Sequence, residues 1–329
     1  MAKLLSPKIK FNDESKLPLV NPETIKLWNK YQIDMSIRDL SPDTIRAYHN
    51  DLTHLWIYTL EHFDNIPISE LSEDELTEFF YYCKTEGNNS RRMKRRMSSI
   101  SAFFKFLRKK RIIDENPMEF IDRPKKDVDV ITQTFLTKEQ VQRMKITLEK
   151  AYNDANSLFG KHSALSNWCY ALFSLSTMAR VNAVSNTRWE KIDFDNRVVN
   201  DVLEKEGKIV TLYFSVEVKN ILLKLKEFRA ENNIDDNGYV FVTKVNGEYK
   251  KASKGALSQW AKKIGSSIGV MTLHPHDFRH SQATLFKEAG MPLEDIAILL
   301  NHESTETTNQ FYIKRNNSQV VIRKDSLEI

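Results

Sequence analysis

The chain has 329 residues, of which 41% are apolar and 28% charged, and its formal net charge is +5 at pH 7. This length suits two domains with sizeable cores, and the composition is that of a globular protein. No apolar run approaches the roughly 18 residues of a membrane span, and the first residues lack the apolar stretch of a signal peptide. Cys83 and Cys169 lie far apart without metal-ligand spacing, so we expect both to be buried thiols. Together these features predict a cytoplasmic protein.

The first third of the chain predicts an all-helical domain. Residues 1–20 are polar and irregular and predict an N-terminal extension, whereas residues 21–122 carry a helical pattern throughout. Ser41 followed by Pro42 predicts one helix start, and Ser72 predicts another as the N-cap of SEDELTEFFYYC. Residues 123–133 are charged and lack apolar periodicity, so we expect an inter-domain linker there.

A strongly basic segment lies within this helical region. Residues 90–111, SRRMKRRMSSISAFFKFLRKKR, contain ten Lys and Arg residues and no acidic residue. Apolar residues recur at helical spacing, which predicts a folded helix over 91–110. Such a run is either a solvated face or a surface for nucleic acid, and charge alone leaves the two evenly balanced. For the second interpretation the candidate DNA-binding residues are Arg91, Arg92, Lys94, Arg95, Arg96 and Lys105, with the early arginines projecting from the start of the helix.

The second domain is expected over residues 134–312, mainly helical with a small antiparallel sheet. Thr137 with Gln140 predicts a capped helix start, and a long helix is expected over 163–180. Two short strands are expected around a turn at 195–196, and hairpins with turns at 206–207 and 246–247. Further helices are expected over 253–264, 276–289, 292–301 and 304–312.

The stretch HPHDFRH (274–280) allows three interpretations. The simplest is a helix that begins after Pro275, with His274 in the preceding loop and His280 structural. His276 and His280 with Asp277 also imitate a zinc-hydrolase pattern, but Arg279 would place a cation beside the metal and only His302 offers a further ligand. In the third, His276 and Arg279 share a helix face and both donate to one phosphate, which excludes a metal.

The region from 274 onward resembles the C-terminal signature of the tyrosine recombinases, the phage-integrase and Xer-type family. That signature combines His-x-x-Arg-His, Ala-Thr, a Gly before a short helix, Leu-Gly-His, a Thr-Thr pair and a nucleophilic tyrosine. The matching stretch here is HPHDFRHSQATLFKEAGMPLEDIAILLNHESTETTNQFY. Arg279 and His302 lie 23 residues apart, which fits the family pattern. By this resemblance His276, Arg279 and His302 are catalytic residues.

The resemblance covers both domains. The segment STMARVNAVSNTRWEKIDF is similar to the one that carries the family's first arginine, which maps to Arg180. The hairpin LEKEGKIVTL is similar to one that carries a catalytic lysine, for which Lys205 is the better match and Lys208 the lesser. The N-terminal region is similar to the family's core-binding, SAM-like domain. The implied fold is a helical core-binding domain plus a mixed α/β catalytic domain with a small antiparallel sheet.

The resemblance implies DNA strand cleavage and rejoining through a 3′-phosphotyrosyl intermediate, with no metal and no cofactor. Arg180 and Arg279 would bracket the non-bridging oxygens, His276 and His302 would donate hydrogen bonds, and Lys205 would protonate the departing 5′-oxygen. The implied partners are double-stranded DNA with an inverted-repeat site and a homo-tetramer on two such sites. Residues 313–329 would dock on a neighbouring protomer.

Two positions depart from the family pattern. Three residues after its first arginine the family usually has an acidic residue that orients it, and here that position is Ala183. Arg180 is therefore less well held unless another acid, such as Glu190, substitutes. Asn301 replaces the usual glycine before the histidine, which alters the expected turn.

The third departure concerns the nucleophile. In most of the family the tyrosine follows the histidine by nine residues, which here is Phe311, whereas Tyr312 is the tenth. One position on a helix is a rotation of about 100°. The leading hypothesis is that Phe311 occupies the nucleophile position and that the chain binds DNA without cutting it. The second is that Tyr312 reacts through a shifted register.

Three function classes therefore remain. The first is a site-specific recombinase for integration, excision or resolution, with a mobile-element origin among the settings considered. The second is a sequence-specific DNA-binding protein without strand-transfer activity. A metal-dependent hydrolase is the most distant.

Overall fold

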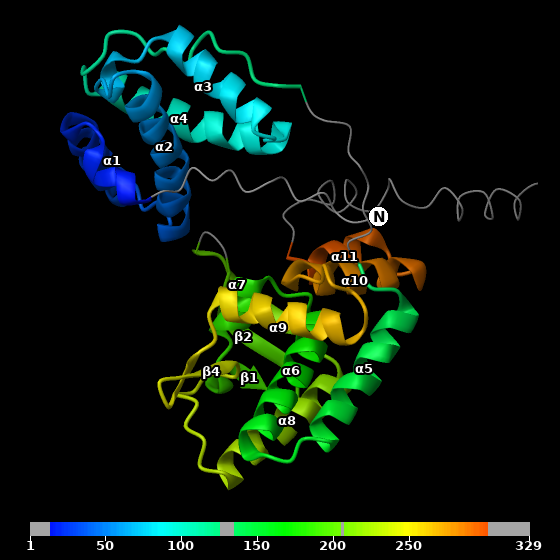
Figure 1. The fold of residues 1–329 in the computed structure, drawn as a ribbon. Helices are drawn as coiled ribbons and strands as arrows, with labels where there is room; N and C mark the ends of the chain where they lie inside the picture. Colours follow the sequence, from blue (N-terminus) through cyan, green and yellow to red (C-terminus); the bar gives the residue numbers. More distant parts are fainter. Residues whose placement is uncertain (1–13, 126–134, 205–206, 302–329) are drawn as a thin grey trace, which may run out of the picture. The chain divides into compact units, whose positions relative to one another are not determined.

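The computed structural model describes residues 14–125, 135–204 and 207–301 (Figure 1). The chain divides into two compact units, Met1–Thr132 and Gln133–Ile329, and each is described by itself. Most of the expected linker, the first 13 residues, and the expected helix at 304–312 with the segment 313–329 lie outside the described residues.

The N-terminal unit is helical throughout its described part, as the sequence predicts (Figure 1). Its α-helices α1 to α4 are joined by short connections, one of which includes the 3₁₀ turn η2, and a second 3₁₀ turn, η1, precedes α1. The elements are η1 (Glu14–Leu19), α1 (Pro22–Ile37), α2 (Pro42–His62), η2 (Ile68–Glu70), α3 (Glu73–Thr85) and α4 (Ser90–Lys109).

The predicted helix starts in this unit are confirmed. The Ser41 hydroxyl accepts from the backbone N–H of Thr44 (3.2 Å), and Ser72 forms a capping box with Glu75. Such caps satisfy backbone donors that the first helical turn leaves without partners. The apolar faces of the helices then meet in one aromatic-rich core, whose largest fully buried side chains include Trp56, Phe79, Phe103 and Phe104.

The C-terminal unit combines helices with two small antiparallel sheets. Helix α6 is buried along most of its length, and α5, α8, α9 and α10 pack around it (Figure 1). The elements are α5 (Lys138–Asn153), α6 (Leu158–Thr177), α7 (Val181–Asn186), η3 (Trp189–Lys191), β1 (Ile192–Asp193), β2 (Val198–Leu203), β3 (Ile209–Tyr213), α8 (Val216–Glu231), β4 (Val242–Val245), β5 (Glu248–Lys251), α9 (Lys254–Ser267), α10 (Pro275–Glu288) and α11 (Leu293–Leu299).

Helices α6 and α8 differ from the sequence-based expectation, and the short α7 was also not expected. Helix α6 was expected over 163–180, but Ser157 caps it earlier and Met178, in the left-handed conformation (φ 50°), ends it after Thr177. Helix α8 was not expected at all, because its segment lies between two clear hairpin signals. Its apolar face was readable at helical spacing, however, since Val218, Ile221, Leu222 and Leu225 are all buried.

The predicted hairpins are confirmed. Strand β2 pairs antiparallel with β1 and β3, and β4 pairs with β5 in a separate sheet. At the β4–β5 turn Asn246 and Gly247 both have positive φ (51° and 90°), the backbone that this dipeptide adopts most readily. The β2–β3 turn includes Gly207 (φ 76°), and the N–H of Glu204 donates to the carbonyl of Lys208 (2.8 Å).

Gly265 permits a close approach at the end of α9. A Cβ atom at this position would overlap the carbonyl oxygen of Val270 and the Cβ of Leu273. The loop 268–274 therefore lies directly against α9 and delivers the chain into α10, the helix that carries His276 and Arg279. No other residue type fits there without moving this loop.

Both cysteines are buried free thiols, as predicted. Burial raises the pKa of Cys169 to about 12 and also raises that of Cys83. Across the three described ranges of the chain, none of the helices has the length and apolar character needed to cross a membrane.

The buried imidazole of His54 makes the N-terminal unit sensitive to acid. Burial, with the positive charges of Arg96, Arg92 and Arg95, lowers its pKa from 6.5 to about 4. Between these values the unfolded chain binds a proton that the folded chain does not, so acidification favours unfolding. Lowering the pH from 7 to 4 should remove about 3 kcal/mol of stability from this unit.

A His54→Gln variant should lose most of this dependence. Urea unfolding followed by peptide-resolved hydrogen exchange in α2 and α4, corrected for intrinsic exchange at each pH, measures it. The exposed His62→Gln variant is the control and should keep the native profile. An unchanged pH profile in His54→Gln would contradict the assignment.

Candidate functional site

Helix α10 presents His276 and Arg279 from its first turns. It begins at Pro275, and the Asp277 carboxylate accepts from the backbone N–H of His274 (2.7 Å). Pro275 fixes the backbone angle of the first helical position, and the acidic cap suits the positive end of the helix dipole. The predicted start of this helix is therefore confirmed, with His274 as its N-cap residue.

Arg279 is a buried arginine that connects three parts of the C-terminal unit. Its side chain is 5% exposed and donates to the carbonyl oxygens of Met178 (2.7 Å) and Leu300. Met178 lies two residues before Arg180, and Leu300 lies two residues before His302. A separate apolar cluster of Met178, Ala283, Ile296 and Leu300 packs α10, α11 and the end of α6 together beside it. Arg279 thus fixes the backbone from which other predicted site residues extend.

Arg180 is paired with a carboxylate that the sequence did not suggest. It follows the left-handed Met178 and is the N-cap residue of α7. Its guanidinium forms an ion pair with Glu204, whose side chain is 1% exposed. Ala183, at the family's acidic position, is buried in the core, and Glu190 pairs instead with Arg188 (2.9 Å). Another acid therefore holds Arg180, as the sequence left open, but this acid is Glu204 and not Glu190, the example named from the sequence.

Glu204 could have been found from strand periodicity. It follows β2, where Val199 and Val202 are buried, and its position places it on the same side of the strand as Val202. A carboxylate on an inward face requires a cation or several donors, because an unpaired buried charge is costly. The sequence feature that could have indicated this pairing is the position of Glu204, two residues after the inward-facing Val202.

His276 lies in the field of both arginines. Although the residue as a whole is exposed, partial desolvation lowers its pKa, with Arg279, Arg180 and His274 contributing in the same direction. The structure therefore brings Arg180, His276 and Arg279 together in one region, and it favours the neutral imidazole.

The other predicted catalytic residues lie outside the described residues. These are Lys205, His302, Phe311 and Tyr312. Lys208, the lesser lysine candidate, closes the β2–β3 hairpin through its carbonyl. Asn301 adopts φ 50°, the left-handed conformation in which glycine is most frequent and asparagine is tolerated. The replacement of glycine by Asn301 thus preserves the turn that ends α11.

The zinc interpretation named His276 and His280 with Asp277, and His302, its further ligand, lies outside the described residues. The Asp277 carboxylate caps the helix. Within residues 14–125, 135–204 and 207–301, no group of three or more His, Cys, Asp and Glu side chains is placed to hold a metal ion.

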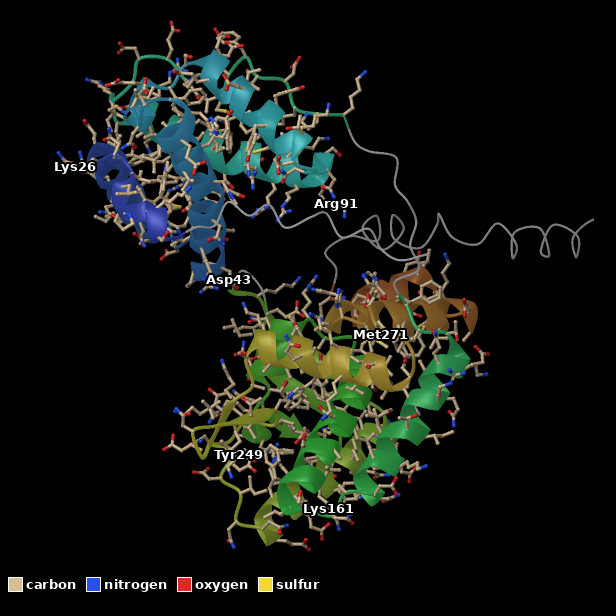
Figure 2. All side chains as sticks on the ribbon, viewed as in Figure 1. Lys26, Asp43, Arg91, Lys161, Tyr249 and Met271 are labelled. Atoms are coloured by element: carbon tan, nitrogen blue, oxygen red, sulfur yellow. The ribbon has the colours of Figure 1, made fainter. Side chains whose placement is uncertain are left out.

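The basic helix α4 presents most of the predicted DNA-binding residues at the surface of the N-terminal unit. Asn89 caps it, and its side chain accepts from the backbone N–H of Arg92 (2.9 Å). Figure 2 shows Arg91 at the start of the helix. Exposed or partly exposed positions are Arg91, Arg92, Lys94, Arg95 and Lys105.

Arg96 was expected to project from the helix with its neighbours, and the structure corrects this. It is 1% exposed and lies 3.8 Å from the carboxylate of Asp51, which α2 contributes. Arg95 (2.6 Å) and Ser99 (2.8 Å) also donate to Asp51, and Arg96 donates to the sulfur of Cys83 (2.8 Å). Burial raises the pKa of Asp51, whereas the arginines oppose that shift. Arg96 therefore anchors α4 to α2 and is not part of the exposed basic face.

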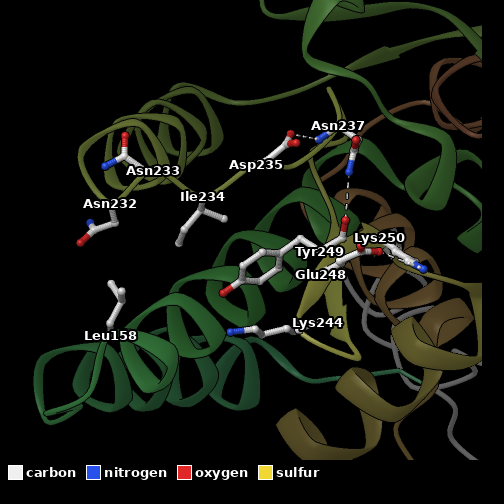
Figure 3. A pocket seen from close by; sticks show the side chains of 11 residues that line it. Leu158, Asn232, Asn233, Ile234, Asp235, Asn237, Lys244, Glu248, Tyr249 and Lys250 are labelled. Atoms are coloured by element: carbon white, nitrogen blue, oxygen red, sulfur yellow. Dashed lines mark hydrogen bonds and ion pairs between the residues drawn. The ribbon is translucent and has the colours of Figure 1, made fainter.

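A surface pocket of the C-terminal unit contains none of the predicted site residues. Its lining comes from the start of α6, the α8–β4 connection and the β4–β5 hairpin (Figure 3). Asn237 shapes one wall, where its side chain donates to the carbonyl of Tyr249 (3.0 Å). The candidate site is thus the group on α7, α10 and the β2–β3 hairpin.

Comparisons with known proteins match both units. The model of the phage integrase family matches residues 134–319, and that of the phage integrase N-terminal SAM-like domain matches residues 29–111. Tyrosine recombinase XerD of Oceanobacillus iheyensis is 26% identical over 288 residues, covering 83% of this chain and 88% of that protein. Tyrosine recombinase XerC of Leptospira interrogans is 26% identical over 314 residues, covering 94% and 93%.

Solved structures show the same fold. XerH site-specific recombinase bound to a palindromic difH substrate aligns with a TM-score of 0.68 and 16% identity, covering 98% of this chain and 91% of that one. The Tn1549 transposon integrase in complex with circular intermediate DNA aligns with a TM-score of 0.63 and 19% identity, covering 92% and 98%.

The two roles of arginine on α4 can be separated by stability. Arg96→Met removes a cation from the buried Asp51 and should cost about 3–5 kcal/mol of unfolding free energy in the N-terminal unit. Arg91→Met, an equally long replacement on the exposed face, should change it by no more than about 0.5 kcal/mol. Hydrogen exchange of peptides from α2 and α4 measures both, and equal small effects would contradict the anchoring role of Arg96.

Proposed function

The chain belongs to the phage integrase family, the tyrosine recombinases, and on this premise we propose that it is a site-specific DNA recombinase that cleaves and rejoins strands. A tyrosine hydroxyl attacks the scissile phosphodiester, forms a 3′-phosphotyrosyl bond and releases a 5′-hydroxyl. Attack by the 5′-hydroxyl of a partner strand reverses the step and joins a new strand. The covalent bond conserves the energy of the phosphodiester, so the reaction needs no cofactor.

Each residue of the candidate site has a proposed role in this reaction. Negative charge increases on the non-bridging oxygens in the pentavalent transition state, where Arg180 and Arg279 donate from two sides. His276 and His302 add hydrogen bonds and assist proton transfer from the nucleophile. Lys205 protonates the departing 5′-oxygen.

One observation carries the proposal, the clustering of Arg180, His276 and Arg279. The buried Arg279 binds the carbonyls of Met178 and Leu300, so a single side chain fixes the segments that lead to Arg180 and to His302. The lowered pKa of His276 keeps the imidazole neutral near neutral pH, able to donate from one nitrogen and accept at the other. Donors fixed before the substrate arrives need no reorganisation during the reaction.

Tyr312 is the proposed nucleophile. The count of nine residues from His302 favours Phe311, but that count assumes one helical register for a segment that lies outside the described residues. Only Tyr312 of this pair carries the hydroxyl that the reaction requires, which supports it as the nucleophile.

A DNA-binding protein without strand transfer is the second candidate, and Phe311 is the observation that favours it. In that case the exposed arginines of α4 bind phosphates and the arginines of the catalytic unit hold an uncleaved phosphodiester. Both candidates predict binding that weakens steeply with salt, because phosphate neutralisation releases counterions.

Covalent adducts distinguish the nucleophiles. Duplexes recovered by the full chain from a randomised pool, nicked so that the cleaved end dissociates, should form adducts with the native chain and with Phe311→Tyr. Tyr312→Phe should form none, since the attacking hydroxyl is gone. Denaturing gels and peptide mapping of the adduct measure this.

The opposite pattern has a defined meaning. Adducts that appear only in Phe311→Tyr would place the nucleophile at 311 and make the native chain a binding protein. Absence of adducts in every variant, with the pool duplexes still bound, would overturn the recombinase proposal in favour of the second candidate.

Assembly on DNA is the remaining part of the proposal. We propose that the site is an inverted repeat and that a homo-tetramer joins two sites. The segment 313–329, with its apolar Val320-Val321-Ile322, is proposed to dock on a neighbouring protomer. The family membership supports the proposal, and the segment itself lies outside the described residues.

Deletion of residues 316–329 should abolish cooperative assembly on two-site DNA while leaving the affinity of one protomer for a half-site unchanged. Sedimentation of the protein–DNA complexes and a half-site binding titration measure the two quantities. Cooperative assembly that survives the deletion would remove this role from the segment.

A further inference from the structure

We infer that Glu204 is the positioning residue for Arg180, in place of the acid that position 183 lacks. The inference rests on the proposed strand-transfer function and adds a residue to it. Glu204 does not touch the DNA in this scheme. It acts by fixing where the guanidinium of Arg180 meets the scissile phosphate.

The first support is the environment of the carboxylate. Its side chain is 1% exposed, and the Nη1 atom of Arg180 donates to one of its oxygens. The other oxygen, Oε1, is buried and has no hydrogen-bond partner among the described residues. Burying a carboxylate is costly without a cation beside it, so the ion pair with Arg180 compensates the burial of Glu204.

The second support is the backbone that holds Glu204. Its N–H donates to the carbonyl of Lys208 across the hairpin (2.8 Å), and its carbonyl accepts from the side chain of Asn182 on α7 (3.4 Å). Glu204 is therefore tied to both elements that it connects, the β2–β3 hairpin and the helix that begins at Arg180. A side chain held in this way defines the direction of its partner.

The third support is that, of the positions considered as carboxylate partners for Arg180, only Glu204 contacts it. Ala183 is fully buried and carries no charge, and the Glu190 carboxylate is bonded to Arg188. Glu204 supplies the missing carboxylate from a different element, the β2–β3 hairpin rather than α7. Because Glu204 directly precedes Lys205, the same short segment aligns the arginine and leads into the lysine that is proposed to protonate the leaving group.

The test measures the rate of single-turnover DNA cleavage. It uses whichever protein forms covalent adducts, the native chain or the Phe311→Tyr variant, and adds further substitutions to it. Glu204→Gln keeps the shape of the side chain and removes its charge, and it should slow cleavage about 100-fold, the size of effect expected from a misplaced catalytic group. Glu190→Gln removes a carboxylate–arginine pair outside the site, that of Glu190 with Arg188, and should cleave at the native rate.

A second substrate separates positioning from general damage to the fold. A neutral methylphosphonate at the mapped cleavage position has one anionic oxygen fewer, so it depends less on the guanidinium of Arg180. On this duplex the rate of Glu204→Gln should approach that of the native protein. In an Arg180→Ala background, adding Glu204→Gln should leave the methylphosphonate rate unchanged, because the positioned group is already absent.

Each result has one meaning. Native cleavage of the phosphate duplex by Glu204→Gln would overturn the inference, and so would an equal loss on both duplexes accompanied by a lower melting temperature, which marks a structural ion pair. Cleavage by no variant at all would instead overturn the proposed function. In that case a double-mutant cycle of Arg180 and Glu204 in thermal unfolding would measure the coupling energy of the pair, and this coupling would then be assigned to stability alone.

Discussion

The buried guanidinium of Arg279 is the interaction on which the rest of the site depends. It binds the carbonyls that end α6 and α11, two segments separated by more than a hundred residues, and an apolar cluster closes around the same junction. A buried cation needs acceptors with good geometry, so the ends of these helices are fixed as firmly as the arginine itself. Arg279 is therefore a structural residue as well as a proposed donor to the phosphate, and its loss would remove both contributions together.

The two arginines of the site are stabilised in different ways. Arg279 is held by neutral carbonyls within the core of the unit, whereas Arg180 is partly exposed and held by a buried carboxylate. A carboxylate partner restricts the rotamers of a long arginine side chain and partly neutralises its positive charge. The guanidinium of Arg180 is therefore well oriented, but its positive electrostatic potential is weaker than that of an unpaired arginine. The site thus has one buried hydrogen-bond donor, Arg279, and one partly exposed donor, Arg180, which Glu204 orients.

The parts of the structure that depend on neighbouring residues in sequence were predictable. Ser41, Ser72 and Thr137 each cap the helix that follows, because a cap requires only residues within one turn. The grouping of His276 with Arg279 was likewise local, and the resemblance supplied Arg180. Glu204 and Arg96 were missed or misplaced because their orientation depends on partners 24 and 45 residues away, Arg180 and Asp51. Charge alone does not reveal whether an arginine faces solvent or a buried carboxylate.

Gly265 shows how far the requirements of the site extend from its chemistry. Its missing side chain lets the loop before α10 lie against α9, and that loop determines where His276 and Arg279 begin. Any substitution there displaces the loop by the width of a methyl group or more, since the overlapping atoms include backbone. Position 265 should therefore tolerate as few replacements as the arginines of the candidate site, although it presents no side chain to that site. Intolerance to substitution would identify the residues that support this site together with the side chains that it presents.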